Sequence, residues 1–217
     1  MSKEIVDLIV TGIFQTLLMT VISTVIAYII GLPYGILLKI TTPGDILGNR
    51  VVHGILGFIA NVFRSIPFLI LLVFLIPFTR MITGTSIGTT ASIVPLTVGA
   101  IPIVARMVEA SLNEISPGIV EAATSMGASP FEIVIHFMIP ECLPSLLSGA
   151  AINIATILGY SAMAGCIGGG GLGAIALNYG YYRYQQDVLW VTVLILIIIV
   201  EIFQEGGTLL TKKTRKA

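Results

Sequence analysis

The chain alternates between long apolar runs and short polar connections, and this pattern predicts membrane-spanning helices. The first run covers Leu8–Leu38 and ends at Lys39, and later runs cover Ala91–Val108, Leu143–Cys166 and Val188–Phe203. A helix needs about 20 predominantly apolar residues to cross the hydrocarbon core of a bilayer. We therefore expect each of these four runs to span a membrane.

A fifth span is expected in the apolar stretch Ile55–Phe78, which contains Asn61 and Arg64. A charge at the bilayer centre costs about 2.5–3.5 kcal/mol even on the lenient insertion scale. The span itself is therefore predicted closer to Ile66–Met81, with Arg64 near the cytoplasmic edge, where a long side chain can reach water. A functional role for Arg64 inside the membrane is the alternative.

The segment Ile167–Gln186, between the last two runs, is predicted to be a loop. Gly168, Gly170 and Gly173 formally match the dinucleotide fingerprint GxGxxG. No predicted strand precedes them and no βαβ unit is available, so we reject a nucleotide site there. Several aromatic residues in and after this loop are typical of an interfacial aromatic belt; they are Tyr179, Tyr181, Tyr182, Tyr184 and Trp190.

Composition agrees with a membrane location. The chain has 217 residues, of which 56% are hydrophobic and only 10% charged, and its mean hydropathy is +1.02. Soluble domains carry roughly 25% charged residues. The sequence therefore predicts an all-α polytopic membrane protein with five transmembrane helices. Its formal net charge of zero argues against nucleic acid as a partner.

The longest segment outside the apolar runs is Ser116–Pro144, which opens with a Ser-Pro pair typical of a helix start. Gly127 is placed to stop a first short helix. Ser129 and Glu132 have the spacing of a capping box at the start of a second, which is expected to end near Pro140. We predict two short helices joined at a glycine corner.

This segment resembles the EAA loop of type I ABC importer permeases, through Glu121, Ala122, Ala123, Gly127 and Ala128, followed by Ile139-Pro140 and Leu143-Pro144. In that family the loop contains the coupling helix, which docks in a groove of a cytoplasmic ATPase. The resemblance implies that the first five of these residues couple the chain to an ATPase. An ordinary helical hairpin loop is the alternative, and the combined spacing favours the family.

A closer resemblance, to methionine importer permeases, covers nearly all of Thr11–Gly207. The residues that carry it are Arg64–Leu71, the glycine run Gly168–Gly173, Tyr179–Tyr181 and Asp187-Val188. It implies methionine as the substrate; a permease for another amino acid or a short peptide is the runner-up. It also implies one permease domain over residues 1–217, with a core at about 11–207, a coupling loop at about 110–143 and a basic cytoplasmic tail at 208–217.

The resemblance also implies partners. Such permeases form homodimers, bind two ATPase subunits and receive substrate from a lipid-anchored extracytoplasmic binding protein. Five helices are too few to enclose a solute path alone, which also favours a two-fold pair. The chain has no GxxxxGK[ST] motif, so ATP and magnesium are expected on the partner ATPase, and this subunit is expected to be non-catalytic.

Two other features bear on the mechanism. His53 and His136 belong to no metal-binding motif, so no metal or other cofactor is expected in the chain. An ion-coupled secondary transporter or channel would favour mid-span carboxylates and an inverted repeat. Neither is found in the sequence, so we rank this alternative far lower.

The fourth run contains the residues that we expect to line the translocation pathway. They are its polar or flexible side chains, which lie on or beside a stripe of small residues (Ala151, Ala155, Gly159) that allows tight helix contact in lipid. The candidates are Asn153, Tyr160, Ser161 and Met163. For Met163 the alternative is a packing role.

Orientation follows from the basic residues. With the N-terminus outside and five spans, eight of the 11 lysines and arginines lie on the cytoplasmic side (Lys39, Arg50, Arg64, Arg106, Lys212, Lys213, Arg215, Lys216) and three outside (Lys3, Arg80, Arg183). This is the bias expected of cytoplasmic loops. It places the Glu121 loop in the cytoplasm, and the family resemblance implies that the membrane is a bacterial inner membrane.

Overall fold

The computed structural model describes residues 3–214, and the described chain is helical with no strand. This confirms the all-α class. In chain order the elements are α1 (Lys3–Ile40), α2 (Arg50–Ser65), α3 (Phe68–Phe74), α4 (Ile76–Thr83), α5 (Thr89–Asn113), α6 (Pro117–Ser125), α7 (Pro130–Glu132), the π-helix η1 (Ile133–Met138), α8 (Ile139–Ala164), the 3₁₀-helix η2 (Gly165–Ile167), α9 (Gly171–Ile175), the π-helix η3 (Ala176–Tyr181) and α10 (Gln186–Thr214).

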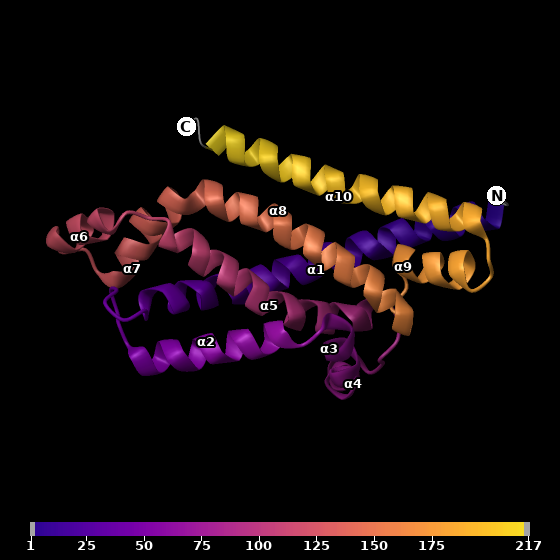
Figure 1. The fold of residues 1–217 in the computed structure, drawn as a ribbon, viewed down its shortest axis with the longest axis horizontal. Helices are drawn as coiled ribbons and strands as arrows, with labels where there is room; N and C mark the ends of the chain where they lie inside the picture. Colours follow the sequence, from indigo (N-terminus) through magenta and orange to yellow (C-terminus); the bar gives the residue numbers. More distant parts are fainter. Residues whose placement is uncertain (1–2, 215–217) are drawn as a thin grey trace.

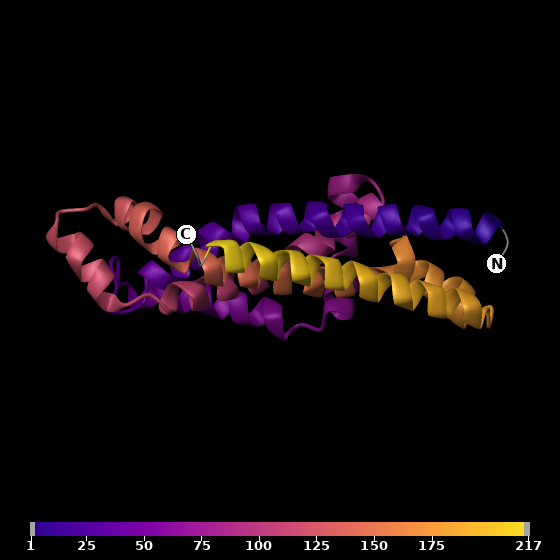
Figure 2. The same ribbon diagram turned by 90° about the horizontal axis from the view of Figure 1, so that it is seen from above.

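Four long helices, α1, α5, α8 and α10, run along the long axis of the molecule (Figure 1). The short helices α6 and α7 lie at one end, and the first turn of α1 lies at the other. The last turns of α10 point toward the α6–α7 end (Figure 1). Figure 2 shows α6 and α7 projecting beyond the ends of the other long helices, so they form a protruding module.

Among the described residues, four helical stretches are each long and apolar enough to cross a membrane: α1, Pro130–Ile167 (which includes α8), α5 and α10. A fifth span is present only if α2 and α3 are counted as one broken span, because the chain bends by 101° between them. The prediction of a span over Ile66–Met81 is wrong, because this stretch is divided between the short helices α3 (7 residues) and α4 (8 residues). The bend between α2 and α3 has a local cause. The α conformation is unfavourable for a residue that precedes a proline, and Ile66, which precedes Pro67, is extended (φ −82°, ψ 122°).

The position of Arg64 differs from the expected one for the same reason. Arg64 lies in the last turn of α2, which starts beside the α6–α7 end and finishes about halfway along the molecule (Figure 1). The prediction that Arg64 lies at the edge next to the Glu121 loop is therefore wrong.

The contact between α1 and α5 is the most extensive between any two described elements, and two glycines of α1 make it possible. A Cβ on Gly31 would lie 2.8 Å from Val104 Cβ, and one on Gly35 would meet the Ala105 carbonyl oxygen and lie 2.6 Å from Val108 Cβ. Small residues at helix interfaces allow the backbones to approach closely. The two helices therefore pack almost backbone to backbone.

The segment Ile167–Gln186 is largely helical, so its prediction as a loop is wrong. It contains α9 and η3, and every residue of α9 is buried. The Gln15 and Thr16 side chains of α1 accept hydrogen bonds from the first N–H groups of α9, with Gly171 N at 2.8 Å from Gln15 Oε1 and Leu172 N at 2.9 Å from Thr16 Oγ1. A polar partner for these buried N–H groups is a tertiary contact, which local sequence does not reveal.

The C-terminal basic segment is helical as far as the structure describes it. The helix α10 continues to Thr214 and includes Lys212 and Lys213, so residues 208–214 extend the last long helix. Arg215 and Lys216, which belong to the predicted tail, lie outside the described residues.

Candidate functional site

The module formed by α6 and α7 turns at Gly127, whose φ of +81° lies in the left-handed region. The Gly127 N–H donates to the Thr124 carbonyl (3.0 Å) and the Ala128 N–H to the Ala123 carbonyl (3.1 Å). These two bonds form a Schellman motif, in which a glycine ends a helix by satisfying its last carbonyls. The predicted glycine stop is confirmed.

The predicted capping box is also confirmed. The Glu132 N–H donates to Ser129 Oγ (3.4 Å), and the Ser129 N–H donates to Glu132 Oε2 (2.8 Å). The expected end of the second helix near Pro140 is wrong, because Pro130–Ile167 is one helical stretch of 38 residues. The π-helix η1 ends at Met138, two residues before Pro140, and such a local widening is one way in which a helix accommodates an irregularity.

The five predicted coupling residues come together on this module but differ in exposure. Glu121, Ala122 and Gly127 are exposed, Ala128 is half-buried, and Ala123 is buried in the core. Ala123 therefore packs the module against its own chain, whereas the other four residues can contact another protein. ATPase contact itself remains a prediction for all of them.

Two further residues of the module were missed from the sequence. Met126 is 69% exposed and Phe131 is 73% exposed, and both lie close to the Gly127 turn in the chain. Large apolar side chains are normally anchors when they lie in an interface. Nothing in their apolar character marks them as exposed, so only the fold reveals that they are accessible to a partner.

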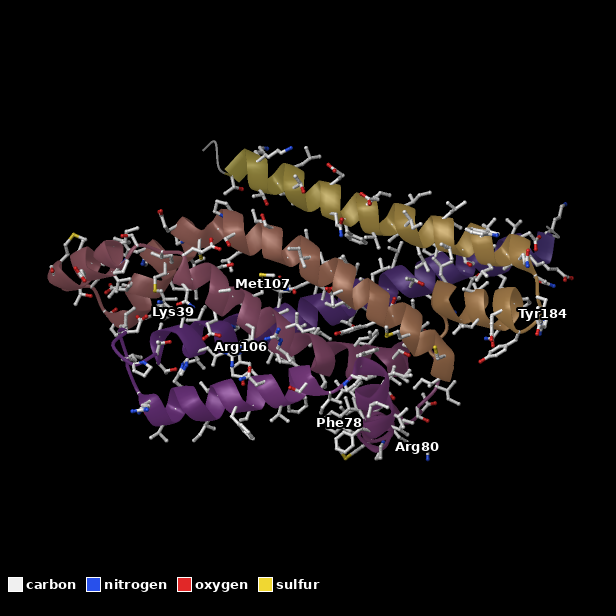
Figure 3. All side chains as sticks on the ribbon, viewed as in Figure 1. Lys39, Phe78, Arg80, Arg106, Met107 and Tyr184 are labelled. Atoms are coloured by element: carbon white, nitrogen blue, oxygen red, sulfur yellow. The ribbon has the colours of Figure 1, made fainter. Side chains whose placement is uncertain are left out.

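A cleft of about 690 Å³ lies between α6 and the connection from α1 to α2. Val120, Glu121 and Thr124 of α6 face it, and the opposite side includes Pro43 and Gly44. An ion pair between Lys39 Nζ and Asp45 Oδ2 (2.9 Å) fixes that connection. Figure 3 shows Lys39 at the same end as the module, and Lys39 and Asp45 line the cleft together with Glu121.

Two of the four predicted pathway residues are buried within this subunit. The Asn153 Nδ2 donates to the Tyr28 hydroxyl of α1 (2.9 Å), and the Ser161 hydroxyl donates to the Leu158 carbonyl (2.7 Å). Each of the two residues is only 1% exposed. In this conformation both serve packing between or within helices.

The other two predicted pathway residues have accessible side chains. Met163 is 47% exposed. The Tyr160 ring stacks flat on Phe68, with centroids 4.2 Å apart and an interplanar angle of 1°, and it borders a cavity beside Arg64. Both remain predictions as pathway residues.

A polar network holds α2 against α5. The Arg106 Nη2 donates to the Gly57 carbonyl (2.9 Å) and to Asn61 Oδ1 (2.8 Å), and Nη1 pairs with Glu109 Oε2 (2.7 Å). Figure 3 shows Arg106 between the two helices. The predicted span Ala91–Val108 ends close to this arginine, but α5 continues to Asn113, and the side chain ties two helices together.

Comparison with known proteins places the chain in context. Residues 31–215 match the family described as "Binding-protein-dependent transport system inner membrane component". Among curated relatives, a probable D-methionine transport system permease protein MetI of Vibrio cholerae is 46% identical over 207 residues, which cover 95% of this chain and 92% of that protein. The D-methionine transport system permease protein MetI of Escherichia coli K12 is 52% identical over 165 residues, or 76% of each chain.

Solved structures agree with the sequence comparisons. A chain of the MetNI methionine ABC transporter in an inward-facing conformation superposes with a TM-score of 0.97 at 48% identity, covering 99% of both chains. An amino acid ABC transporter solved with histidines matches with a TM-score of 0.78 at 21% identity, which is a likeness of fold alone. The chain belongs to the family of binding-protein-dependent transport system inner membrane components.

Proposed function

We propose that this chain is the membrane-spanning permease subunit of an ATP-driven importer that carries methionine across the cytoplasmic membrane. The observation that carries the proposal is the full-length agreement with the MetNI permease chain, at a TM-score of 0.97 and 48% identity. The curated relatives named as D-methionine permeases support the same substrate.

In this proposal the working unit is larger than the chain. Two copies form a homodimer around the pathway, two ATPase subunits dock on the two α6–α7 modules, and an extracytoplasmic lipoprotein delivers the substrate. ATP and magnesium belong to the ATPase. The exposed Glu121, Met126 and Phe131 support docking at the module, because a protruding surface with apolar anchors suits a protein groove.

The proposed mechanism is mechanical. Closure of the ATPase pair on ATP moves the docked modules, the paired bundles open outward, and hydrolysis resets them. The proposed orientation has the N-terminus outside and the module in the cytoplasm. Its support is the bias of basic residues and the position of α6 and α7 at the end opposite the first turn of α1 (Figure 1).

Uptake of labelled methionine tests this function. Cells would express the chain with its ATPase and binding protein, with competition by other amino acids and with ATP depletion as a control. We expect ATP-dependent uptake that only methionine competes. ATP-dependent uptake of a different solute would contradict methionine as the substrate but not the assignment as an importer permease. Uptake that follows an ion gradient instead of ATP would contradict both the substrate and the permease assignment.

Two substitutions test the module. Glu121→Lys reverses the exposed charge beside the cleft, and Gly127→Val places a β-branched residue at a φ of +81°, where it is strained. We expect both variants to insert normally and to lose most ATP-dependent uptake. Gly127→Asn should retain uptake, because asparagine tolerates the left-handed conformation. Full uptake in both Glu121→Lys and Gly127→Val would contradict the coupling role.

A further inference from the structure

A cavity of about 220 Å³ opens beside the bend between α2 and α3. Arg64 lies on one side of it, the stacked rings of Phe68 and Tyr160 lie on another, and Gly99 and Ile103 of α5 complete the wall. Pockets for drug-sized ligands measure roughly 300–1,000 Å³. This smaller volume suits a ligand the size of a single amino acid.

Arg64 provides a positive charge to the cavity. Within residues 3–214, Arg64 makes no ion pair and no side-chain hydrogen bond, in contrast to Arg106. Arg64 is exposed in the last turn of α2, and this helix ends about halfway along the molecule rather than at either end of the long helices (Figure 1). An arginine inside the membrane-spanning part of a helical bundle defaults to a functional role.

The rest of the cavity is apolar and aromatic. Leu71, Ile66 and Ile103 line it with the Phe68–Tyr160 pair, and Gly99 leaves room for that pair, since a Cβ there would lie 3.3 Å from the Phe68 ring. A guanidinium next to an apolar, aromatic wall matches a ligand with a carboxylate and an apolar tail. Thioether sulfur also makes favourable contacts with aromatic rings.

We propose that this cavity is a substrate subsite within the membrane, in which Arg64 binds the carboxylate of an amino acid and the Phe68–Tyr160 pair contacts its apolar side chain. The inference rests on the proposed function and adds a location and a chemical basis for recognition. A guanidinium can hold a carboxylate through two parallel hydrogen bonds, and a low-dielectric surrounding strengthens that pairing.

The experiment must separate the proposed role of Arg64 from a simpler one. Arg64 lies at the C-terminal end of α2, where a positive charge favours the helix dipole. That role requires no ligand and predicts the same behaviour toward charged and uncharged amino acid derivatives. A lipid phosphate is another anion that the guanidinium could bind. The experiment separates these roles.

Photolabelling of the complete transporter tests the proposal. The permease and ATPase complex in phosphatidylcholine nanodiscs would be labelled with photo-methionine, a diazirine analogue with free amino and carboxylate groups. We expect label on peptides that contain Phe68 or Tyr160, competed by methionine. Photo-methionine amide, which lacks the carboxylate, should label at least about tenfold less, as expected for losing a charged hydrogen bond.

Variants complete the test. Arg64→Gln should reduce photo-methionine labelling at least about tenfold, and Arg64→Lys should fall between it and the wild type because it keeps the charge without the planar fork. Arg50→Gln, on the same helix but outside the cavity, is the matched control and should label normally. If Arg64→Gln fails to fold, the ratio of labelling by photo-methionine to labelling by photo-methionine amide in the wild type still tests the proposal.

Three outcomes would overturn the subsite. These are equal labelling by the acid and the amide, label confined to other peptides, and displacement by phosphatidylglycerol but not by methionine, which would assign the cavity to lipid phosphate. Each leaves the proposed function intact if ATP-dependent methionine uptake is present. Absence of that uptake in the wild type would instead reject the proposed function.

Discussion

At the scale of single residues, exposed apolar side chains fall into two groups with different causes. Most lie along the long helices, as Phe14, Ile29 and Trp190 do, and contact with lipid accounts for them. Met126 and Phe131 instead belong to a module that projects beyond those helices (Figure 2). Lipid does not account for their exposure there, so a protein partner is the better explanation.

Truncation of Phe131 tests this explanation. Phe131→Ala, or Met126→Ala, should leave folding unchanged, because neither side chain packs in the core, and should weaken ATPase binding. Loss of a central aromatic anchor costs about 2 kcal/mol or more, which corresponds to about 30-fold in affinity. Surface plasmon resonance with immobilised permease and purified ATPase would measure it.

Phe58→Ala is the control for this experiment, because Phe58 is 69% exposed on α2, away from the module. It should bind ATPase normally. Equal affinity for all three variants would place the docking surface elsewhere on the chain.

The residue scale also shows a limit of prediction from sequence. Asn153, Tyr160 and Ser161 are polar groups of one helix, α8, and the sequence assigns them a shared pathway role. Their directions differ: Asn153 reaches Tyr28 on α1, whereas Tyr160 stacks on Phe68. Which neighbour a side chain meets depends on packing between helices that are distant in sequence, so polarity alone does not predict it.

At the scale of elements, local rules predicted the parts of the fold that local interactions determine. Hydropathy located the four long helices, the glycine stop located the end of α6 at Gly127, and the Ser129–Glu132 capping box located the start of α7. The errors occur where tertiary contacts dominate. The fold of α9 depends on hydrogen bonds that its first N–H groups donate to the side chains of Gln15 and Thr16, 156 residues earlier in the chain.

The α1–α5 contact gives a prediction at this scale. Gly35→Ala should destabilise the subunit, because its Cβ would meet the Ala105 carbonyl and Val108, and such overpacking typically costs about 1–3 kcal/mol. Thermal unfolding of the detergent-solubilised protein would show a lower Tm. Gly206→Ala is the control, since nothing lies within 4 Å of that position. Identical Tm values for the two variants would refute backbone-to-backbone packing.

At the scale of the whole molecule, the small-residue stripe has two environments. Its first member, Ala151, is buried and closely approached by Gly207 of α10. Further along α8, Ala155 and Gly159 border an open apolar groove of about 350 Å³ between α8 and α10. The stripe therefore serves packing within the subunit at one end and is free to contact a second copy at the other.

Gly159→Leu tests a contact with a second copy. A leucine should fill the groove and weaken the permease dimer by about tenfold, the scale of helix contacts in membranes, or block the pathway. Native mass spectrometry would give the dimer fraction, and uptake would give the activity. Gly54→Leu is the control, because its surroundings are also open. Wild-type dimer and uptake in Gly159→Leu would argue against this contact.

The continuity of Pro130–Ile167 has a further consequence. A flexible connection would absorb a displacement of the module, but this helical stretch has no break between α7 and the far end of α8. This helical stretch can therefore transmit a displacement of the module, at its N-terminal end, to Tyr160 and Met163 near its C-terminal end. A π-turn contains one residue more than an α-turn, and each residue of an α-helix corresponds to a rotation of about 100°. Conversion of η1 to α-helix would therefore rotate the module by about 100° about the helix axis relative to α8. A displacement of the module would in this way change the rotational position of the helix segment that carries Tyr160 and Met163.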